Sequence, residues 1–222
     1  MKKTFILLWA IMLHVMSIQA QKYNFEDYVY PFGCRTYVSP DSKGNLLSVT
    51  QYSFESLGYY NYLVAEVYIG HGIMSAKSIY RYRIEGNTVI SDVQLGQNGL
   101  TGNTKSQDRL ILFAFPVNNK PFKWSETARG EKYQCTSEYV YINASIDHNS
   151  LFLKSIKITR DNSYIFGKKM HRIKETSYWV SDYGRIITYL DWDGTKRVSS
   201  KLDVLDYIQE ISEVEYNKQI KK

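Results

Sequence analysis

Histidine and cysteine are the side chains that proteins use most often for catalysis and metal binding, and this chain has few of them. Beyond residue 20 the histidines are His71, His148 and His171, which lie far apart and lack metal-ligand spacing. There is no GxSxG nucleophile elbow and no P-loop, since Gly70-His71-Gly72 lacks the further glycine. We therefore expect a protein that is not an enzyme and has no metal, no cofactor and no catalytic residues. A hydrolase assembled from dispersed Ser, His and Asp is the alternative.

The two cysteines, Cys34 and Cys135, are a candidate disulfide. An exported chain folds in an oxidising compartment, where one bridge between them is allowed. Closing a loop of about 100 residues would stabilise the fold by roughly 4 to 5 kcal/mol. Two buried thiols on unrelated strands are the other interpretation.

A basic stretch runs from Lys154 to Lys174 and contains one acid, Asp161. Such a local excess of positive charge can attract an anionic partner such as lipid headgroups, lipopolysaccharide or an acidic glycan. A solvated strand face would carry the same charges. The residues of this predicted basic patch are Lys154, Lys157, Arg160, Lys168, Lys169, Arg172 and Lys174.

Tyrosine is unusually frequent, with 20 residues in a chain of 222. Its ring is apolar and its hydroxyl polar, so it suits both half-exposed sheet faces and ligand-binding surfaces. Cross-strand pairing within a sheet is an ordinary use for such residues. The candidates for a ligand-binding surface are Tyr60, Tyr62, Tyr80, Tyr82 and Trp179.

The first 20 residues have the pattern of a secretory signal peptide. Two lysines precede an apolar run from Phe5 to Leu13, and the segment ends at Ala20. The run is short for a bilayer span, which takes about 20 apolar residues, although a retained N-terminal anchor is the alternative. We predict a signal peptide over 1–20 and a single β-rich domain over 21–222. The processed protein is expected to be periplasmic or secreted, and not integral to the membrane.

Removal of that segment lowers the formal net charge from +6 to +4, because it holds two lysines and no acid. Nucleic acid is not an expected partner for an exported chain of this charge. The expected partners are lipid, an anionic envelope component or another envelope protein. A hydrophobic content of 44% with 23% charged residues excludes wholesale disorder.

The rest of the sequence alternates β-prone runs with turns. Residues 59–69 are rich in Tyr, Val, Leu and Ile, which favours a strand. Within residues 79–84 tyrosine alternates with arginine, and this period of two also favours a strand. Residues 96–108 are mostly polar or glycine and predict a loop. Further strands are predicted at Thr88–Leu95, Leu110–Phe115, Tyr133–Ile142 and Leu151–Thr159.

Three strands near the C-terminus are predicted to form a meander. Tyr178–Val180 turns through Ser181–Gly184 into Arg185–Leu190, and Asp191–Gly194 leads on to Thr195–Val198. An Asp-Gly pair between β-prone runs favours a hairpin. The aspartates of the second turn would also suit a fragment of a calcium loop, although the later glutamate of such loops is missing.

The last residues favour a helix over about 201–217. Apolar residues from Leu202 to Ile211 recur at helical spacing, and Ser200 followed by Asp203 resembles an N-terminal cap. A strand over Leu202–Ile208 is the rival. With the preceding strands, this predicts a mainly β protein: a curved antiparallel sheet or incomplete β-barrel with a C-terminal helix.

An ordered series of short motifs extends over about residues 28 to 192. It comprises Tyr30-Pro31-Phe32-Gly33, Arg35–Val38, Leu112-Phe113-Ala114-Phe115-Pro116, Trp124, Tyr133-Gln134-Cys135, Phe152, Ile156 and Tyr178–Ile187. This order resembles a loose group of largely uncharacterised exported bacterial β-sheet proteins. The last turn departs from the group, with Asp182-Tyr183-Gly184 where a glycine-rich turn is usual. The resemblance implies a curved antiparallel sheet, reminiscent of periplasmic lipoprotein carriers, and no catalytic residues.

These observations favour an exported, non-enzymatic binding or carrier protein, whose ligand could be a lipid or another amphipathic molecule. The alternatives are a surface structural or protein-interaction module and, second, an unrecognised hydrolase.

Overall fold

The computed structural model describes residues 25–28, 34–41, 43–57, 60–69, 75–95, 110–128 and 131–221. The predicted signal peptide, the predicted loop over 96–108 and His71 lie outside these residues. Within them the chain forms thirteen strands, one 3-10 turn, η1 (Phe25–Tyr28), and one α-helix, α2 (Glu213–Gln219). No helix in this part of the chain is both long and apolar enough to cross a membrane.

All thirteen strands belong to one antiparallel sheet, with the order β13-β8-β9-β10-β11-β12-β1-β2-β3-β4-β5-β6 and with β7 beside β8. In chain order they are β1 (Cys34–Pro40), β2 (Leu46–Leu57), β3 (Tyr60–Ile69), β4 (Ser75–Glu85), β5 (Thr88–Leu95), β6 (Leu110–Ala114), β7 (Phe122–Ala128), β8 (Glu131–Ile146), β9 (Asn149–Phe166), β10 (Lys169–Val180), β11 (Gly184–Trp192), β12 (Thr195–Leu202) and β13 (Leu205–Ile211).

The hairpins form where turn residues tolerate a positive φ. Asp147 and His148 join β8 to β9 with φ of 52° and 62°, and Asp193 and Gly194 join β11 to β12 with φ of 50° and 88°. Two successive positive φ values match the twist of the flanking strands, which is why Asp-Gly favours such turns. The predicted meander is therefore confirmed, as β10, β11 and β12.

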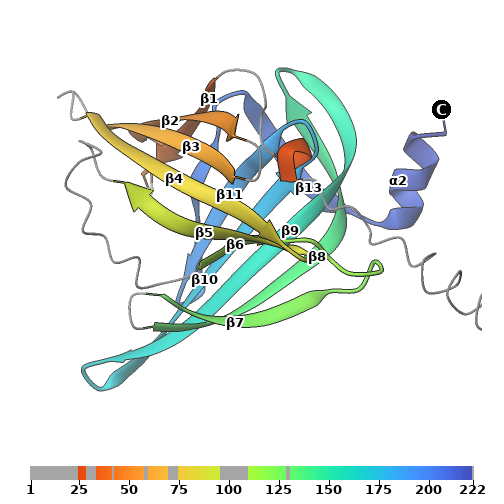
Figure 1. Ribbon diagram of the computed structural model, residues 1–222. Helices are drawn as coiled ribbons and strands as arrows, with labels where there is room; N and C mark the ends of the chain where they lie inside the picture. The colour runs from red at the N-terminus through yellow and green to blue at the C-terminus, as the bar shows by residue number, and fades with distance from the viewer. Residues whose placement is uncertain are drawn as a thin grey trace, which may run out of the picture.

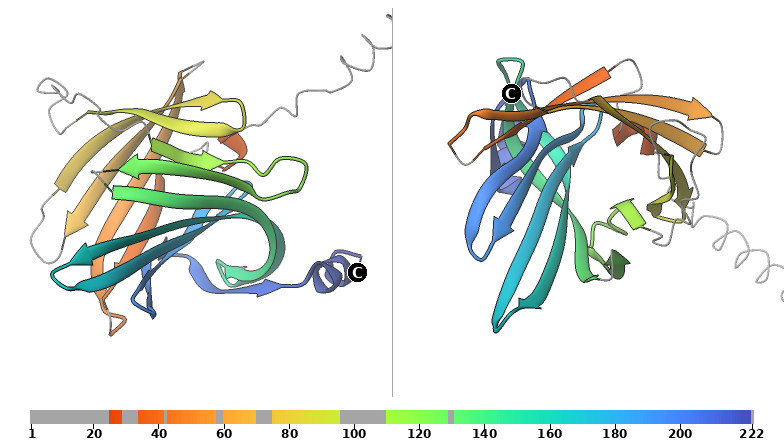
Figure 2. Two further views of the ribbon diagram at one scale, coloured as in Figure 1. Left: turned by 90° about the horizontal axis from the view of Figure 1, so that it is seen from below. Right: turned by 90° about the vertical axis from the view of Figure 1, so that its left-hand side faces the viewer.

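The sheet curls into an incomplete barrel, which confirms the predicted fold class (Figures 1 and 2). Its ends meet at a seam where β6 lies beside β7 and β8 without a backbone ladder. Side chains satisfy the β6 backbone there: Arg160 donates to the Ile111 and Leu112 carbonyl oxygens at 2.8 and 2.9 Å. Ser137 donates to the Ala114 carbonyl.

Two apolar cores lie on opposite faces of β10. Inside the curl, Phe113 of β6 packs edge-on against Trp179 of β10, with a centroid distance of 5.2 Å. Successive residues of a strand point to opposite faces, so Tyr178 belongs to the second core. That core includes Leu205 of β13, which is 1% exposed. β13, which pairs with β8, thus crosses the outer face of β10 to β12.

The helix predicted over 201–217 is wrong for its first eleven residues. That stretch completes β12 and forms β13, as the rival strand interpretation anticipated, and α2 is confined to Glu213–Gln219. The chain turns at residues 203–204, and the register between β13 and β8 shifts after Leu205. The apolar residues therefore recur at every third position, as on one face of a helix, although they belong to strands. Ser200, read as a helix cap, lies within β12. The N-cap is Ser212, whose Oγ accepts from the Glu215 N–H at 3.1 Å.

Candidate functional site

An open cleft of about 250 Å³ lies between the outer face of β10–β12 and the crossing strand β13. The sheet supplies two aromatic side chains and a cation, and β13 supplies an aliphatic side chain and a carboxylate. The lining residues are Tyr178, Tyr189, Lys196, Ile208 and Glu210.

The register of the meander places the sheet residues of the cleft. Tyr189 pairs with Thr176, two residues before Tyr178, so both tyrosines project from one face. Their ring centroids are 6.2 Å apart at 89°, an edge-to-face arrangement. Lys196 pairs with Asp191 and extends its ammonium over the Tyr189 ring, 4.4 Å from the centroid.

Glu210 is the charged centre of the cleft. Its Oε1 accepts a hydrogen bond from the Tyr178 hydroxyl and another from Lys157 Nζ at 2.8 Å. Lys157 also lies 3.8 Å from Glu138, so it stands between two carboxylates. Burial alone would raise the pKa of Glu210, but the hydrogen bonds from Lys157 and Tyr178 outweigh it and the pKa is lowered.

The pKa of Tyr178 shifts in the opposite direction to that of Glu210. Its pKa is raised, first because burial disfavours the phenolate and then because the neighbouring Glu210 carboxylate accepts its proton in a hydrogen bond. Burial also raises the pKa of Tyr189. At neutral pH the cleft therefore presents two neutral phenols and one charged carboxylate.

This arrangement suits the binding of an amphipathic molecule. The tyrosine rings and Ile208 provide apolar walls, while Glu210 and Lys196 provide opposite charges at the same cleft. Both hydrogen bonds to the carboxylate reach Oε1, which leaves Oε2 able to accept from a ligand.

The structure disperses the predicted basic patch over both faces of the β9–β10 hairpin and pairs most of it with acids. Lys157 joins the cleft, Lys169 lies 3.8 Å from Asp193, and Arg172 is paired with Asp161, whose pKa it lowers. Three other lysines also belong to the patch. Lys154 stands over the Tyr139 ring at 3.9 Å, Lys168 is exposed at the hairpin turn, and Lys174 pairs in register with Asp161.

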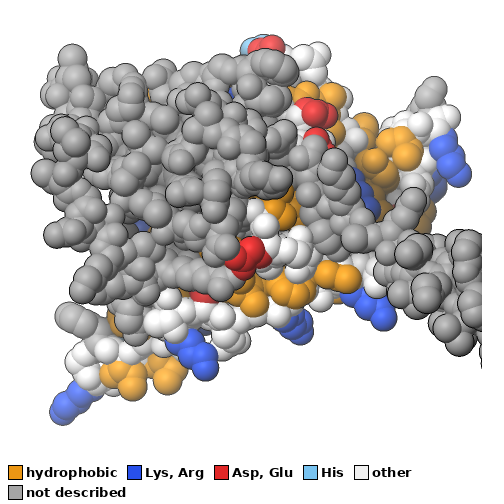
Figure 3. Space-filling model, in the orientation of Figure 1, with side chains coloured by type: hydrophobic (Ala, Val, Ile, Leu, Met, Phe, Trp, Pro, Cys, Tyr) orange, Lys and Arg blue, Asp and Glu red, His pale blue; other side chains and the backbone are white. Residues whose placement is uncertain are grey.

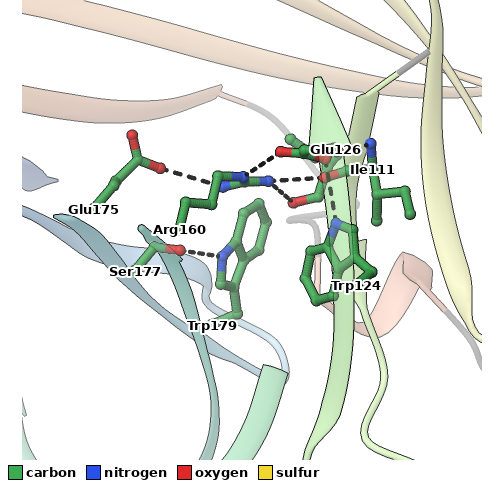
Figure 4. A network of polar contacts seen from close by, with 8 residues as sticks. Ile111, Trp124, Glu126, Arg160, Glu175, Ser177 and Trp179 are labelled. Carbon is green, nitrogen blue, oxygen red and sulfur yellow. Dashed lines mark hydrogen bonds and ion pairs between the residues drawn. The ribbon is translucent and has the colours of Figure 1, made fainter. Parts of the chain in front are cut away.

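Arg160 of the same patch is part of the seam instead (Figure 4). Its Nε donates to Glu126 at 3.1 Å and its Nη1 to Glu175 at 3.2 Å. Glu126, with a side chain only 6% exposed, also accepts from the Trp124 indole and from the Ile111 N–H, both at 3.2 Å. These groups bond to one another and to the β6 backbone, which gives Arg160 a structural role.

Of the ligand-binding candidates, Trp179 is buried in the core inside the curl, where its indole donates to Ser177 at 3.0 Å. The four tyrosines lie on the neighbouring strands β3 and β4. The backbone register pairs Tyr62 with Arg81, Tyr80 with Leu63, and Tyr82 with Asn61. The side chains of Tyr60, Tyr62, Tyr80 and Tyr82 lie outside the described residues.

The candidate disulfide is not present in the structure. Cys135 is a free thiol buried on β8, and Cys34 is on β1, with β9 to β12 between the two strands in the sheet. Burial, followed by the negative charge of Glu126, raises the pKa of Cys135 to about 12. This thiol is therefore protonated and unsuited to nucleophilic chemistry.

Both described histidines contact an aspartate away from the cleft. His148 Nδ1 is 3.2 Å from Asp206, whose carboxylate also accepts from Ser145 at 2.8 Å. The serine thus bonds to the aspartate rather than to the imidazole, unlike the relay of a serine hydrolase. His171 Nδ1 is 2.7 Å from Asp193 at the hairpin turn, and its ring packs against both the Tyr164 and the Trp192 rings.

Sequence reasoning missed the cleft residues Tyr178, Tyr189, Lys196, Ile208 and Glu210. The correctly predicted meander contained the signal for the two tyrosines, because pairing the strands across its first turn, Ser181–Gly184, places them on one face. Nothing comparable pointed to Glu210, which lay in the segment predicted as a helix.

No family model matches this chain, and no curated protein matches its sequence. Two solved structures are similar. A Bacteroides fragilis protein described as exported, with a YmcC-like fold, has 11% identity and a TM-score of 0.45 over 82% of this chain and 99% of its own. A Parabacteroides distasonis protein described as a lipoprotein has 12% identity and a TM-score of 0.37 over 79% of this chain and 94% of its own. Neither description gives an activity or a ligand.

Proposed function

We propose that this chain is an exported, non-enzymatic binding protein for a small amphipathic molecule, with the cleft between β10–β12 and β13 as its site. One observation carries the proposal: two tyrosine rings, an aliphatic side chain and a pair of opposite charges converge on one open cleft of about 250 Å³. Binding sites combine apolar walls with a few polar groups that orient the ligand in this way.

The size and chemistry of the cleft narrow the ligand class. Its volume lies just below the roughly 300 to 1,000 Å³ of typical small-molecule sites, which favours a small molecule or one end of a longer lipid. A hydroxyl or amino donor of the ligand would meet Glu210. An acidic or hydroxyl group would meet Lys196, and the carbon skeleton would lie against Tyr178, Tyr189 and Ile208.

The protonation states support binding rather than catalysis. The raised pKa of Tyr178 and the lowered pKa of Glu210 keep a neutral phenol beside a charged carboxylate at neutral pH. A general acid or base works best with a pKa near the operating pH, which neither group has.

Native mass spectrometry of the chain purified from its own host tests this proposal. We expect a bound small molecule whose bound fraction falls at least about tenfold in Tyr189→Ala and in Lys196→Gln, each of which removes one contact of about 1.4 kcal/mol or more. Tyr207→Ala is the matched control, because Tyr207 is an exposed tyrosine of β13 that does not line the cleft. A protein that is repeatedly ligand-free, or a bound mass that both cleft variants retain, would overturn the proposal.

A second candidate, a protein-interaction module, is favoured by the position of β13. This strand ends the sheet order and pairs only with β8 among the described strands, so its other edge can accept a strand from a partner. Cross-linking in intact cells from a photoreactive residue at position 209 on β13 would identify such a partner, and a freely diffusing monomer without cross-links would exclude it.

A further inference from the structure

Hairpin tips gather at one end of the sheet. The strands β9-β10-β11-β12-β1-β2 are consecutive antiparallel neighbours, so the β9–β10, β11–β12 and β1–β2 turns all open at the same end. The β9–β10 hairpin projects furthest, on the side of the molecule away from α2 (Figure 1). Its strand β10 is joined to the neighbouring β11–β12 turn, because Asp193 Oδ1 accepts from the Arg172 N–H at 2.8 Å.

These tips expose large apolar side chains. Ile165 and Met170 pair directly across the β9–β10 hairpin and are 72% and 68% exposed, so two adjacent side chains present their apolar surface to solvent. The other two hairpins add three exposed residues at the same end, namely Trp192, Leu46 and Leu47. Trp192 contacts Tyr164 and His171, so it lies on the opposite face of the sheet from Ile165 and Met170, and the tips are apolar on both faces. Large exposed apolar side chains that gather at one end of a sheet indicate an interaction site.

Basic side chains surround this apolar surface. The segments 163–172, 191–197 and 41–47 together hold six basic residues and three acids. Lys196 of this set lines the cleft and Arg172 is paired with Asp161, so the basic residues left for the tips are Lys43, Lys168, Lys169 and Arg197. The acids are engaged locally: Asp193 with Lys169 and His171, Asp191 with the Gly194 N–H, and Asp41 with the backbone N–H groups of its own turn. Figure 3 shows Lys or Arg side chains next to hydrophobic ones at the projecting end of the hairpin.

We propose that this end of the sheet docks onto an anionic lipid bilayer. Projecting apolar side chains insert at the boundary between headgroups and acyl chains, while neighbouring lysines remain at the level of the phosphates. Each lysine near an anionic surface contributes about 1 kcal/mol, so Lys168 and Lys169 add an attraction that salt weakens. A protein groove would fit a hairpin less well, because the exposed residues are distributed over three separate tips. The proposal concerns a different surface from the cleft and does not depend on its ligand.

The test is sedimentation of the exported chain with vesicles of phosphatidylcholine, with and without phosphatidylglycerol. We expect binding to the anionic vesicles that falls about tenfold or more in Ile165→Ser/Met170→Ser, which removes two inserted side chains. Lys168→Gln/Lys169→Gln should lose about tenfold on anionic vesicles and nothing on phosphatidylcholine alone. Val214→Ser/Ile220→Ser is the matched control, because these side chains of the α2 segment are similarly exposed at the far side of the molecule.

A second readout reports insertion directly. Brominated acyl chains should quench the fluorescence of Trp192, and Trp192→Phe should remove that quenching in a chain that starts at residue 21. The other tryptophans of that chain are Trp124, at the seam, and the buried Trp179. All variants carry the same N-terminus, so any retained leader would contribute equally to each. Equal vesicle binding by the tip and control variants would overturn the proposal, as would quenching that survives Trp192→Phe. Capture of a protein at the tips without any vesicle binding would also overturn it.

Discussion

Glu210 connects the cleft to the stability of the fold at the scale of a single residue. The pKa of Glu210 is lowered by Lys157 and Tyr178 despite burial. The ionised carboxylate therefore stabilises the fold fully above about pH 4.5, the ordinary pKa of glutamate, and this stabilisation is lost as the pH falls through the lowered pKa. We expect Glu210→Gln to lower the free energy of unfolding by about 1 kcal/mol at neutral pH, a modest figure because solvent screens this half-exposed pair.

Urea unfolding of both proteins across the acid range checks this dependence. The difference between wild type and Glu210→Gln should disappear in acid, where the wild-type carboxylate also becomes neutral. Asp147→Asn is the control, since this exposed turn carboxylate lies at a positive φ that asparagine tolerates. A difference that persists unchanged in acid would show that the variant acts through packing and not through charge.

Cys135 should be unreactive as long as the chain is folded. Burial raises its pKa from 9.0 to about 12, so thiolate is scarce at mildly alkaline pH and the sulfur is also shielded from reagents. In a Cys34→Ser chain, which leaves one thiol, alkylation by iodoacetamide should require unfolding. Intact mass under native and denaturing conditions measures this, and rapid labelling of the native chain would contradict the buried position.

Arg160 acts at the scale of elements, because it joins β6 to β7 and β9 where no ladder exists. Arg160→Met would leave the Glu126 carboxylate, which is only 6% exposed, without its ion-pair partner. We therefore expect the free energy of unfolding to fall by about 3 kcal/mol. Arg160→Met/Glu126→Gln should recover part of that loss, since the buried charge is removed together with its partner. Thermal or urea unfolding of the double-mutant cycle gives the coupling.

The matched control for this cycle is Arg172→Met. Arg172 also pairs with a carboxylate, Asp161, but at the surface with a side chain 66% exposed, so it should cost less than about 1 kcal/mol. Equal losses at Arg160 and Arg172 would mean that the seam is not closed by this network.

The elements that sequence predicted well are those encoded locally. An Asp-Gly pair or a polar turn fixes a hairpin within a few residues, and the β10–β12 meander was found in this way. Beyond the mis-assigned helix, the strands β2 and β7 were not predicted, and the run Phe122–Ala128 of β7 is only seven residues long. The cleft depends on β13 crossing distant strands, and neither propensity nor periodicity encodes such a contact.

At the scale of the whole molecule, two halves of the chain meet through one short ladder. β1 is joined to β12 by the pairs Tyr37–Leu202 and Val38–Lys201, and this is the link between the strands β1–β6 and the strands β8–β13 in the sheet order. Arg160 and its neighbours provide the second link at the seam. Cooperative unfolding of the sheet therefore depends on a small number of residues at these two places.

Leu202→Ala tests the first link. Leu202 is fully buried, so truncation should cost about 2 to 5 kcal/mol, and because it lies in the joining ladder it should also loosen β1 and β2 before β9 and β10. Hydrogen exchange should then show earlier exchange in β1 and β2 than in β9 and β10. Ile142→Ala is the matched control: Ile142 is also fully buried, but its ladder partners lie in β9 and β13 of the same half, so a similar loss should leave the exchange order unchanged. Identical exchange patterns in the two variants would mean that the halves are coupled chiefly through the seam.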